Sequence, residues 1–209
     1  MKTLIALCIC GLSIPFAAQT TLRTFTSPDG TFQFKYSDVL VDCMSAGEQE
    51  NGARSSMPDS CMSQGTMCDG PGSEGSTMAC FAYPHERFKD KPLFVAATFY
   101  VSEIHSAKTE EVCLMGSPGW LVINSNASTT RINHVSFKTF EIGDNWTSGG
   151  QSGPAYRTFH NGTCYELGIQ TNASHAVYDP GTVKEFTKKD LSEVEGRLRQ
   201  ALNSFVFLK

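Results

Sequence analysis

Hydrophobic and polar residues alternate along several short stretches of this chain, as they do in strands with one buried face. Residues 31–36 (TFQFKY) alternate in this way directly after a strong turn at residues 27–30. Residues 94–104 are β-branched, aromatic and almost continuously apolar, which predicts a central strand. Residues 132–142 alternate again and predict another strand. The pattern therefore indicates a sheet whose strands come from well-separated parts of the chain.

The clearest hairpin signal is the Asn-Gly pair at residues 161–162, which stands between two strand-like runs. Both positions of a two-residue turn must tolerate positive φ, and Asn and Gly do so. Such a turn places Phe159 opposite Cys164 and Arg157 opposite Glu166, so that the two opposite charges face each other. The residues expected on the core face of this hairpin are Tyr156, Tyr165, Leu167 and Ile169.

Apolar residues near the C-terminus recur at helical spacing and predict a helix that begins at Asp190, with Glu193 completing a capping box. The expected apolar stripe consists of Leu191, Val194, Leu198, Ala201 and Leu202. A short strand is expected over residues 205–208. The acidic run at residues 109–111 predicts the start of a second helix.

The first 18 residues have the layout of a secretory signal peptide, with a basic start, an apolar run over residues 4–16 and two alanines at the exit. The apolar run is too short for a permanent anchor, and no second stretch is long enough for a transmembrane helix. We therefore expect residues 19–209 to form a single secreted or periplasmic domain. Removing Lys2 changes the formal charge from −4 to −5. A mildly acidic chain without a basic run argues against nucleic-acid binding.

Six cysteines remain once Cys8 and Cys10 leave with the signal peptide, and an even number in an exported chain favours up to three disulfides. Four of them bracket an insertion at about residues 44–79 that is rich in Met, Gly, Ser and Cys and lacks hydrophobic periodicity. We expect local pairing among these four and a long-range link between Cys113 and Cys164, although spacing leaves the connectivity open. The disulfide candidates are Cys43, Cys61, Cys68, Cys80, Cys113 and Cys164.

Several motifs resemble those of PsbP-type domains and of uncharacterised secreted bacterial proteins in the same structural neighbourhood. They are SPDGTFQFKY at residues 27–36, CFAYP at 80–84, YRTFHNGTCYEL at 156–167 and LNSFVF at 202–207. The resemblance implies an α+β fold, a twisted antiparallel sheet flanked by helices in an α/β/α sandwich, here with a disulfide-rich loop insertion. It also implies a non-enzymatic binding or accessory domain that contacts another envelope or extracellular protein. The resemblance carries no functional residues over to this chain.

Two alternatives compete with the binding domain. The first is an enzyme that uses Cys164, four residues from His160, or an unidentified pair of carboxylates. The hairpin register opposes the Cys–His pair, because it places the two side chains on opposite faces, and a disulfide would remove the thiol.

The second alternative is a soft-metal protein that binds copper through the insertion. Its candidate ligands are Met62, Met67, Cys61 and Cys68. Thioether sulfurs remain available to Cu(I) when thiols are oxidised. The chain has no Cys-x-x-Cys pair, so its spacing does not predict zinc. Without such a metal, no cofactor is expected.

Overall fold

The computed structural model of the protein describes residues 21–44, 61, 68, 75–115, 122–147, 149–174 and 181–208, with the backbone alone at 122–127 and 144–146. The expected signal peptide, residues 1–18, lies outside the described residues, as does most of the cysteine-rich insertion. The single secreted domain over residues 19–209 stays a prediction.

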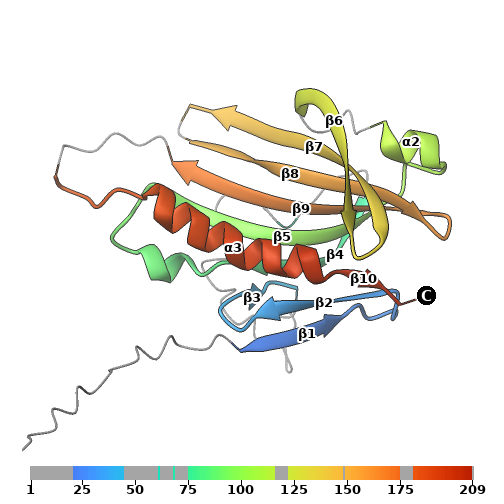
Figure 1. The fold of residues 1–209 in the computed structure, drawn as a ribbon. Coiled ribbons are helices and arrows are strands. Elements are labelled where there is room, and N and C mark those ends of the chain that lie inside the picture. The colour runs from blue at the N-terminus through green and yellow to red at the C-terminus, as the bar shows by residue number, and fades with distance from the viewer. Residues whose placement is uncertain are drawn as a thin grey trace, which may run out of the picture.

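The described strands form two antiparallel sheets (Figure 1). The small sheet has the order β1 (Leu22–Thr26), β2 (Phe32–Ser37) and β10 (Val206–Phe207). The large sheet has the order β3 (Val41–Asp42), β4 (Gly75–Ala82), β5 (Phe94–Ile104), β9 (Thr163–Ser174), β8 (Gly149–His160), β7 (Val135–Trp146) and β6 (Val122–Ile132).

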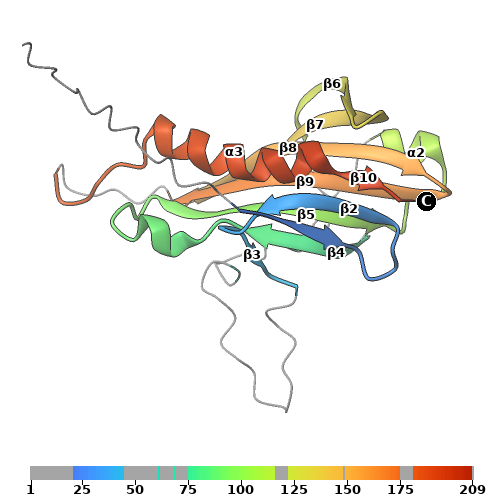
Figure 2. The ribbon, with the colours of Figure 1, turned by 60° about the horizontal axis from the view of Figure 1, so that its bottom comes forward.

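Helices lie on both sides of the large sheet. The long helix α3 (Lys188–Ser204) and the small sheet lie side by side over one face, which we call the helix face (Figures 1 and 2). The short helix α2 (Glu110–Leu114) packs on β8 and β9 at the opposite face, which we call the disulfide face. A 3-10 turn, η3 (His85–Phe88), connects β4 to β5. This arrangement confirms the predicted α+β fold of an antiparallel sheet flanked by helices.

The main core lies between the large sheet and its cover on the helix face, and it is rich in aromatic rings. Phe34 of β2 meets Phe81 of β4 and Phe99 of β5 edge to face, with ring centres 5.3 and 5.0 Å apart. Edge-to-face pairs at this spacing are favourable because the positive ring edge meets the negative ring face. α3 contributes the buried residues Val194, Leu198, Ala201 and Leu202 to the same core.

The hairpin and the central strand are confirmed. β5 spans residues 94–104 as predicted and lies between β4 and β9. Asn161 and Gly162 both have positive φ in the turn, and Phe159 faces Cys164 while Arg157 faces Glu166. The four residues predicted for the core face of the hairpin all belong to the main core. A single turn signal therefore set the register of two 12-residue strands.

Two predicted boundaries are wrong. The run over residues 132–142 is not one strand, because Asn133 and His134 adopt positive φ and turn the chain, so that Ile132 of β6 faces Val135 of β7. The C-terminal helix begins at Lys188 rather than Asp190. Thr187 is its N-cap, and Asp190 is the third helical residue of the capping box. Either Thr or Asp can cap a helix, and the sequence pattern did not separate the two.

The end of the predicted insertion belongs to the sheet. β4 begins at Gly75, and Met78 packs against the main core from within that strand. The hydrophobic pattern did not predict this strand, because its first residues are Gly and Ser, which are not typical of strands.

Candidate binding groove

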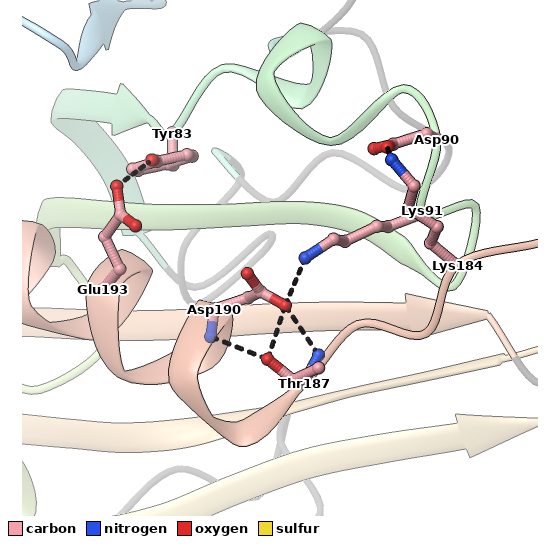
Figure 3. Close-up of polar contacts among 7 residues, drawn as sticks. All are labelled: Tyr83, Asp90, Lys91, Lys184, Thr187, Asp190 and Glu193. Carbon is pink, nitrogen blue, oxygen red and sulfur yellow. Dashed lines mark hydrogen bonds and ion pairs between the residues drawn. The ribbon is translucent and has the colours of Figure 1, made fainter.

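The residues of α3 fall into three stripes, which give the helix three different neighbours. One stripe, Val194 to Leu202, is buried in the core. A second stripe, Asp190 and Glu193, is directed toward the β4–β5 connection (Figure 3). The third stripe, Leu191, Glu195 and Arg199, recurs every fourth residue and lines an open groove over the far half of the sheet. Leu191, predicted for the buried stripe, is half-buried at this groove.

The start of α3 is fixed by a network around Asp190 (Figure 3). The Asp190 carboxylate accepts hydrogen bonds from the backbone N–H and the hydroxyl of Thr187, at 2.8 and 2.7 Å. Lys91, from the β4–β5 connection, donates to the same carboxylate at 2.5 Å. The Lys91 ammonium, together with Thr187, lowers the pKa of Asp190 to about 2. A carboxylate that stays ionised therefore attaches the start of α3 to the β4–β5 connection.

Two further contacts attach the same helix end to the β4–β5 connection (Figure 3). The Tyr83 hydroxyl donates to Glu193 at 3.1 Å, and burial, with the Glu193 charge, raises the pKa of Tyr83 to about 12. Lys184, just before the helix, pairs with Asp90 at 2.5 Å and lowers the pKa of that carboxyl. This second pair is exposed and contributes little to stability, but it restrains the chain that leads into Phe186.

Small residues in β8 form the floor of the groove. Gly150, Ser152 and Pro154 alternate along β8 on the helix face and line the groove. Gly153 lies so close to β9 that a Cβ there would be 1.9 Å from the Ile169 carbonyl oxygen. A side chain at position 153 would therefore require the backbone of β8 or β9 to move.

The resulting groove has a volume of about 460 Å³ between α3 and strands β7 to β9. Its apolar walls come from Phe186, Leu191, Ile169 and Ala173. Phe186 is held in place by stacking on Phe94, with ring centres 4.9 Å apart. Grooves of this size with apolar walls and a few polar groups are the usual form of a ligand site.

The charged residues of the groove are Glu141 of β7 and Glu195 and Arg199 of α3. Arg199 pairs with Glu195 at 3.5 Å. Burial raises the pKa of Tyr156, and the charge of Arg199 opposes the rise. Glu141 is exposed and has no ion-pair partner among the described residues. The formal charge of the groove is therefore −1, from two carboxylates and one guanidinium.

None of the predicted site residues that the structure describes lines this groove. The structure joins Cys43 to Cys61, Cys68 to Cys80 and Cys113 to Cys164. Cys80 packs with Tyr100, and Cys164 packs beneath α2, both on the disulfide face. Met62 and Met67, the thioether candidates for copper, lie outside the described residues.

Cys164, the sequence candidate for catalysis, and Glu166, the expected partner of Arg157, both have structural partners. The Cys164 sulfur is bonded to Cys113 and fully buried, so it is not a nucleophile in this state. Glu166 receives Arg157 at 2.6 Å and the Tyr100 hydroxyl at 2.8 Å, with all three side chains buried. Burial, with the adjacent Glu166 charge, raises the pKa of Tyr100 well above its usual range.

Sequence reasoning missed Glu141, Glu195 and Arg199, which are the charged residues of the groove. The available signal was the third stripe of the helix, Leu191–Glu195–Arg199, together with an unusually small-residue stretch at 149–155. Only the fold shows that these two segments face each other with β7 beside them.

No family model and no curated protein matches the sequence. Solved structures that match include cyanobacterial PsbP (CyanoP) from Synechocystis, at 17% identity over 96% of this chain and 98% of that one. The Ran-binding protein Mog1p of Saccharomyces cerevisiae matches at 10% identity over 91% and 97% of the two chains. A Bacteroides thetaiotaomicron protein matches at 11% identity over 89% of this chain, which spans 48% of that protein. Each has a TM-score of 0.40. The PsbP match agrees with the resemblance carried by the sequence motifs, and we base no further argument on these likenesses.

Proposed function

We propose that this chain is an exported binding domain whose groove holds a peptide segment of another extracytoplasmic protein, one with an apolar side chain next to a basic one. The observation that carries the proposal is the groove itself, about 460 Å³ in volume, with apolar walls and one carboxylate, Glu141, that has no cationic partner among the described residues.

The two halves of the proposed ligand follow from the two kinds of lining. An apolar side chain between Phe186, Leu191 and Ile169 would remove apolar surface from water on both sides, which is favourable at about 25 cal/mol per Å². A Lys or Arg beside it would pair with Glu141 at the rim of the groove. Rim charges add specificity and a faster association rate more than affinity.

Export is supported by the disulfides together with the signal-peptide layout. The structure has three disulfides. Disulfides persist in oxidising compartments and are rare in the cytosol. None of the described helices is long and apolar enough to cross a membrane. The proposed partner is accordingly another protein outside the cytosol.

A binding role accounts for the groove better than catalysis by the residues that line it. A glycosidase-type mechanism needs two free carboxylates across a cleft, whereas Glu195 is engaged by Arg199 at 3.5 Å. The groove therefore offers one available acid, Glu141, which suits recognition of a cation.

The test is selection from a displayed library of random 12-residue peptides against the immobilised, oxidised protein. We expect enriched sequences to place Leu, Phe or Tyr next to Lys or Arg. Ala173 is exposed at the groove, so Ala173→Trp should fill it without disturbing the core and should weaken the selected peptide at least 10-fold. Glu141→Gln should remove the preference for a basic residue.

Thr129→Trp provides the matched control, because Thr129 is exposed on β6 and pairs with Lys138, away from the groove. This variant should bind the peptide like the wild type. The proposal fails if no sequence is enriched or if Ala173→Trp binds as well as Thr129→Trp. Cleavage of the bound peptide that disappears in Glu141→Gln would instead favour the enzyme alternative.

A further inference from the structure

Two of the three disulfides lie against each other on the disulfide face. The Sγ atoms of Cys43, Cys68 and Cys80 all lie within 4.8 Å of one another, and Cys61 is bonded to Cys43. Three sulfur atoms therefore share one small volume and a fourth is bonded to one of them, although their cysteines span 38 residues of sequence from 43 to 80. A pair of unrelated structural disulfides does not require this proximity.

The cysteines of this cluster are held by the backbone of β4 and by a side chain. The Cys43 N–H donates to the Cys80 carbonyl at 2.9 Å, which continues the β3–β4 pairing. The Thr77 hydroxyl donates to the Cys68 carbonyl at 2.5 Å. Ala82 and the ring of Tyr100 pack against the cluster on its buried side. These contacts fix Cys43, Cys68 and Cys80 independently of the S–S bonds, so their sulfurs should stay close when those bonds are broken.

We propose that, when these two disulfides are reduced, Cys43, Cys61, Cys68 and Cys80 bind one zinc ion as a tetrahedral tetrathiolate site. Zinc–thiolate bonds of about 2.3 Å place the sulfurs of such a site about 3.8 Å apart. The sulfurs of Cys43, Cys68 and Cys80 that are not bonded to each other need to approach by about 1 Å at most to reach that arrangement, whereas the two sulfurs of each reduced disulfide move apart. Sulfur-only tetrahedral sites are typical of zinc.

The chemistry balances with a dithiol as the reductant. Each disulfide takes two electrons and two protons from one dithiol, which becomes a disulfide, so two dithiols convert the cluster into four thiols. Zinc then displaces four protons and leaves a tetrathiolate with a formal charge of −2 at the metal. The inference concerns the disulfide face and does not depend on the groove.

The structure also separates these two disulfides from the third. Cys61 and Cys68 are half-buried, so a dithiol can approach each of the two clustered bonds from one side. Cys113 and Cys164 are both fully buried. The main core of the helix face contains no cysteine. Mild reduction should therefore open the cluster first and leave the core and the third disulfide in place.

The test is a cobalt titration of the mildly reduced, desalted full chain under anaerobic conditions. We expect one Co²⁺ per chain, with a thiolate-to-metal charge-transfer band and the intense visible bands of tetrahedral cobalt, and full displacement by Zn²⁺. Oxidised protein should give none of these bands. Cys68→Ala/Cys80→Ala should lose them, whereas the matched pair Cys113→Ala/Cys164→Ala should keep them. Equal loss in both pairs would overturn the site.

X-ray absorption of the zinc-loaded, reduced wild type tests the same site without any variant. Four sulfur neighbours at about 2.3 Å are expected, and nitrogen or oxygen ligands in the shell would contradict the proposal. Met62→Leu/Met67→Leu separates this site from a thioether copper site. The tetrathiolate predicts unchanged zinc affinity in that variant, and a 10-fold loss would show that the methionines are ligands instead.

Discussion

The most tightly determined residue contact on the disulfide face is that of Tyr100 over Gly168. The two residues face each other across β5 and β9, and the Tyr100 ring crosses above Gly168 to reach Glu166, two residues along β9. A Cβ at position 168 would be 2.2 Å from the ring. The glycine is required by this close approach, because any side chain would displace the tyrosine from its carboxylate.

We predict that Gly168→Ala lowers the free energy of unfolding by about 1–3 kcal/mol, the usual range for overpacking a core. Gly196→Ala is the matched control. Gly196 lies within α3 with open space around it, so alanine there should add about 1 kcal/mol of stability through helix propensity. Urea unfolding of both variants measures the two effects. A stable Gly168→Ala would show that the Tyr100–Glu166 contact is not formed in solution.

The buried charge pair next to it gives a second residue-scale prediction. Arg157 and Glu166 are 2.6 Å apart, with side chains 4% and 1% exposed. Glu166→Gln should cost about 3–5 kcal/mol, because it leaves a buried guanidinium without its counter-charge. The double variant Arg157→Met/Glu166→Leu should be more stable than Glu166→Gln alone, since it removes both charges. Urea unfolding checks the order, and the reverse order would contradict it.

At the scale of elements, the sequence predicted those whose local signals were unambiguous. Asn161-Gly162 specified a hairpin, and the apolar run over residues 94–104 specified β5, because a turn type and a buried strand each have a distinct pattern. Asn133-His134 forms a comparable turn, but it lacks the glycine of the usual two-residue hairpin turn, so the pattern of residues 132–142 predicts one strand where β6 ends and β7 begins. Local patterns fail where the turn residue is atypical.

The start of α3 provides a pH prediction. Because the pKa of Asp190 is lowered from 3.8 to about 2, its contribution to stability is complete above pH 3.8 and is lost as the pH falls toward 2. Lys91 is the largest cause, so Lys91→Met should raise the pKa of Asp190 toward 3.8, while Thr187 keeps it somewhat below. NMR titration of the Asp190 carboxyl measures this shift. An unchanged midpoint in Lys91→Met would show that the ion pair in Figure 3 is not populated.

The groove belongs to the scale of the whole molecule, which is why sequence reasoning did not find it. Glu141, the small residues of β8 and the Leu191–Glu195–Arg199 stripe come from three elements whose adjacency depends on the strand order. The hydrophobic periodicity of an element shows which of its sides is buried, but it does not show which strand lies next to it in the sheet. The cysteines, which the sequence offers as candidate site residues, lie on the opposite face, where they serve as crosslinks.

The disulfides allow a last prediction about the whole molecule. Cys113–Cys164 closes a loop with a sequence separation of 51, and Cys68–Cys80 one of 12. Chain entropy then assigns about 4 kcal/mol to the first bond and about 3 kcal/mol to the second, because a longer loop restricts the unfolded chain more. The first bond is anchored in α2, a helix of 5 residues whose buried residue is Cys113.

We therefore expect Cys113→Ala/Cys164→Ala to lose more stability in urea than Cys68→Ala/Cys80→Ala. In the first variant, amide hydrogen exchange should rise within α2 while β5 and α3 stay protected, since the main core lacks cysteine. If exchange instead rises uniformly, the crosslink stabilises the fold as a whole and α2 is not the element it anchors. If Cys68→Ala/Cys80→Ala proves the more damaging pair, the two faces of the sheet are coupled through the β3–β4 edge. Cys43 follows β3 at that edge and keeps its bond to Cys61 in this variant.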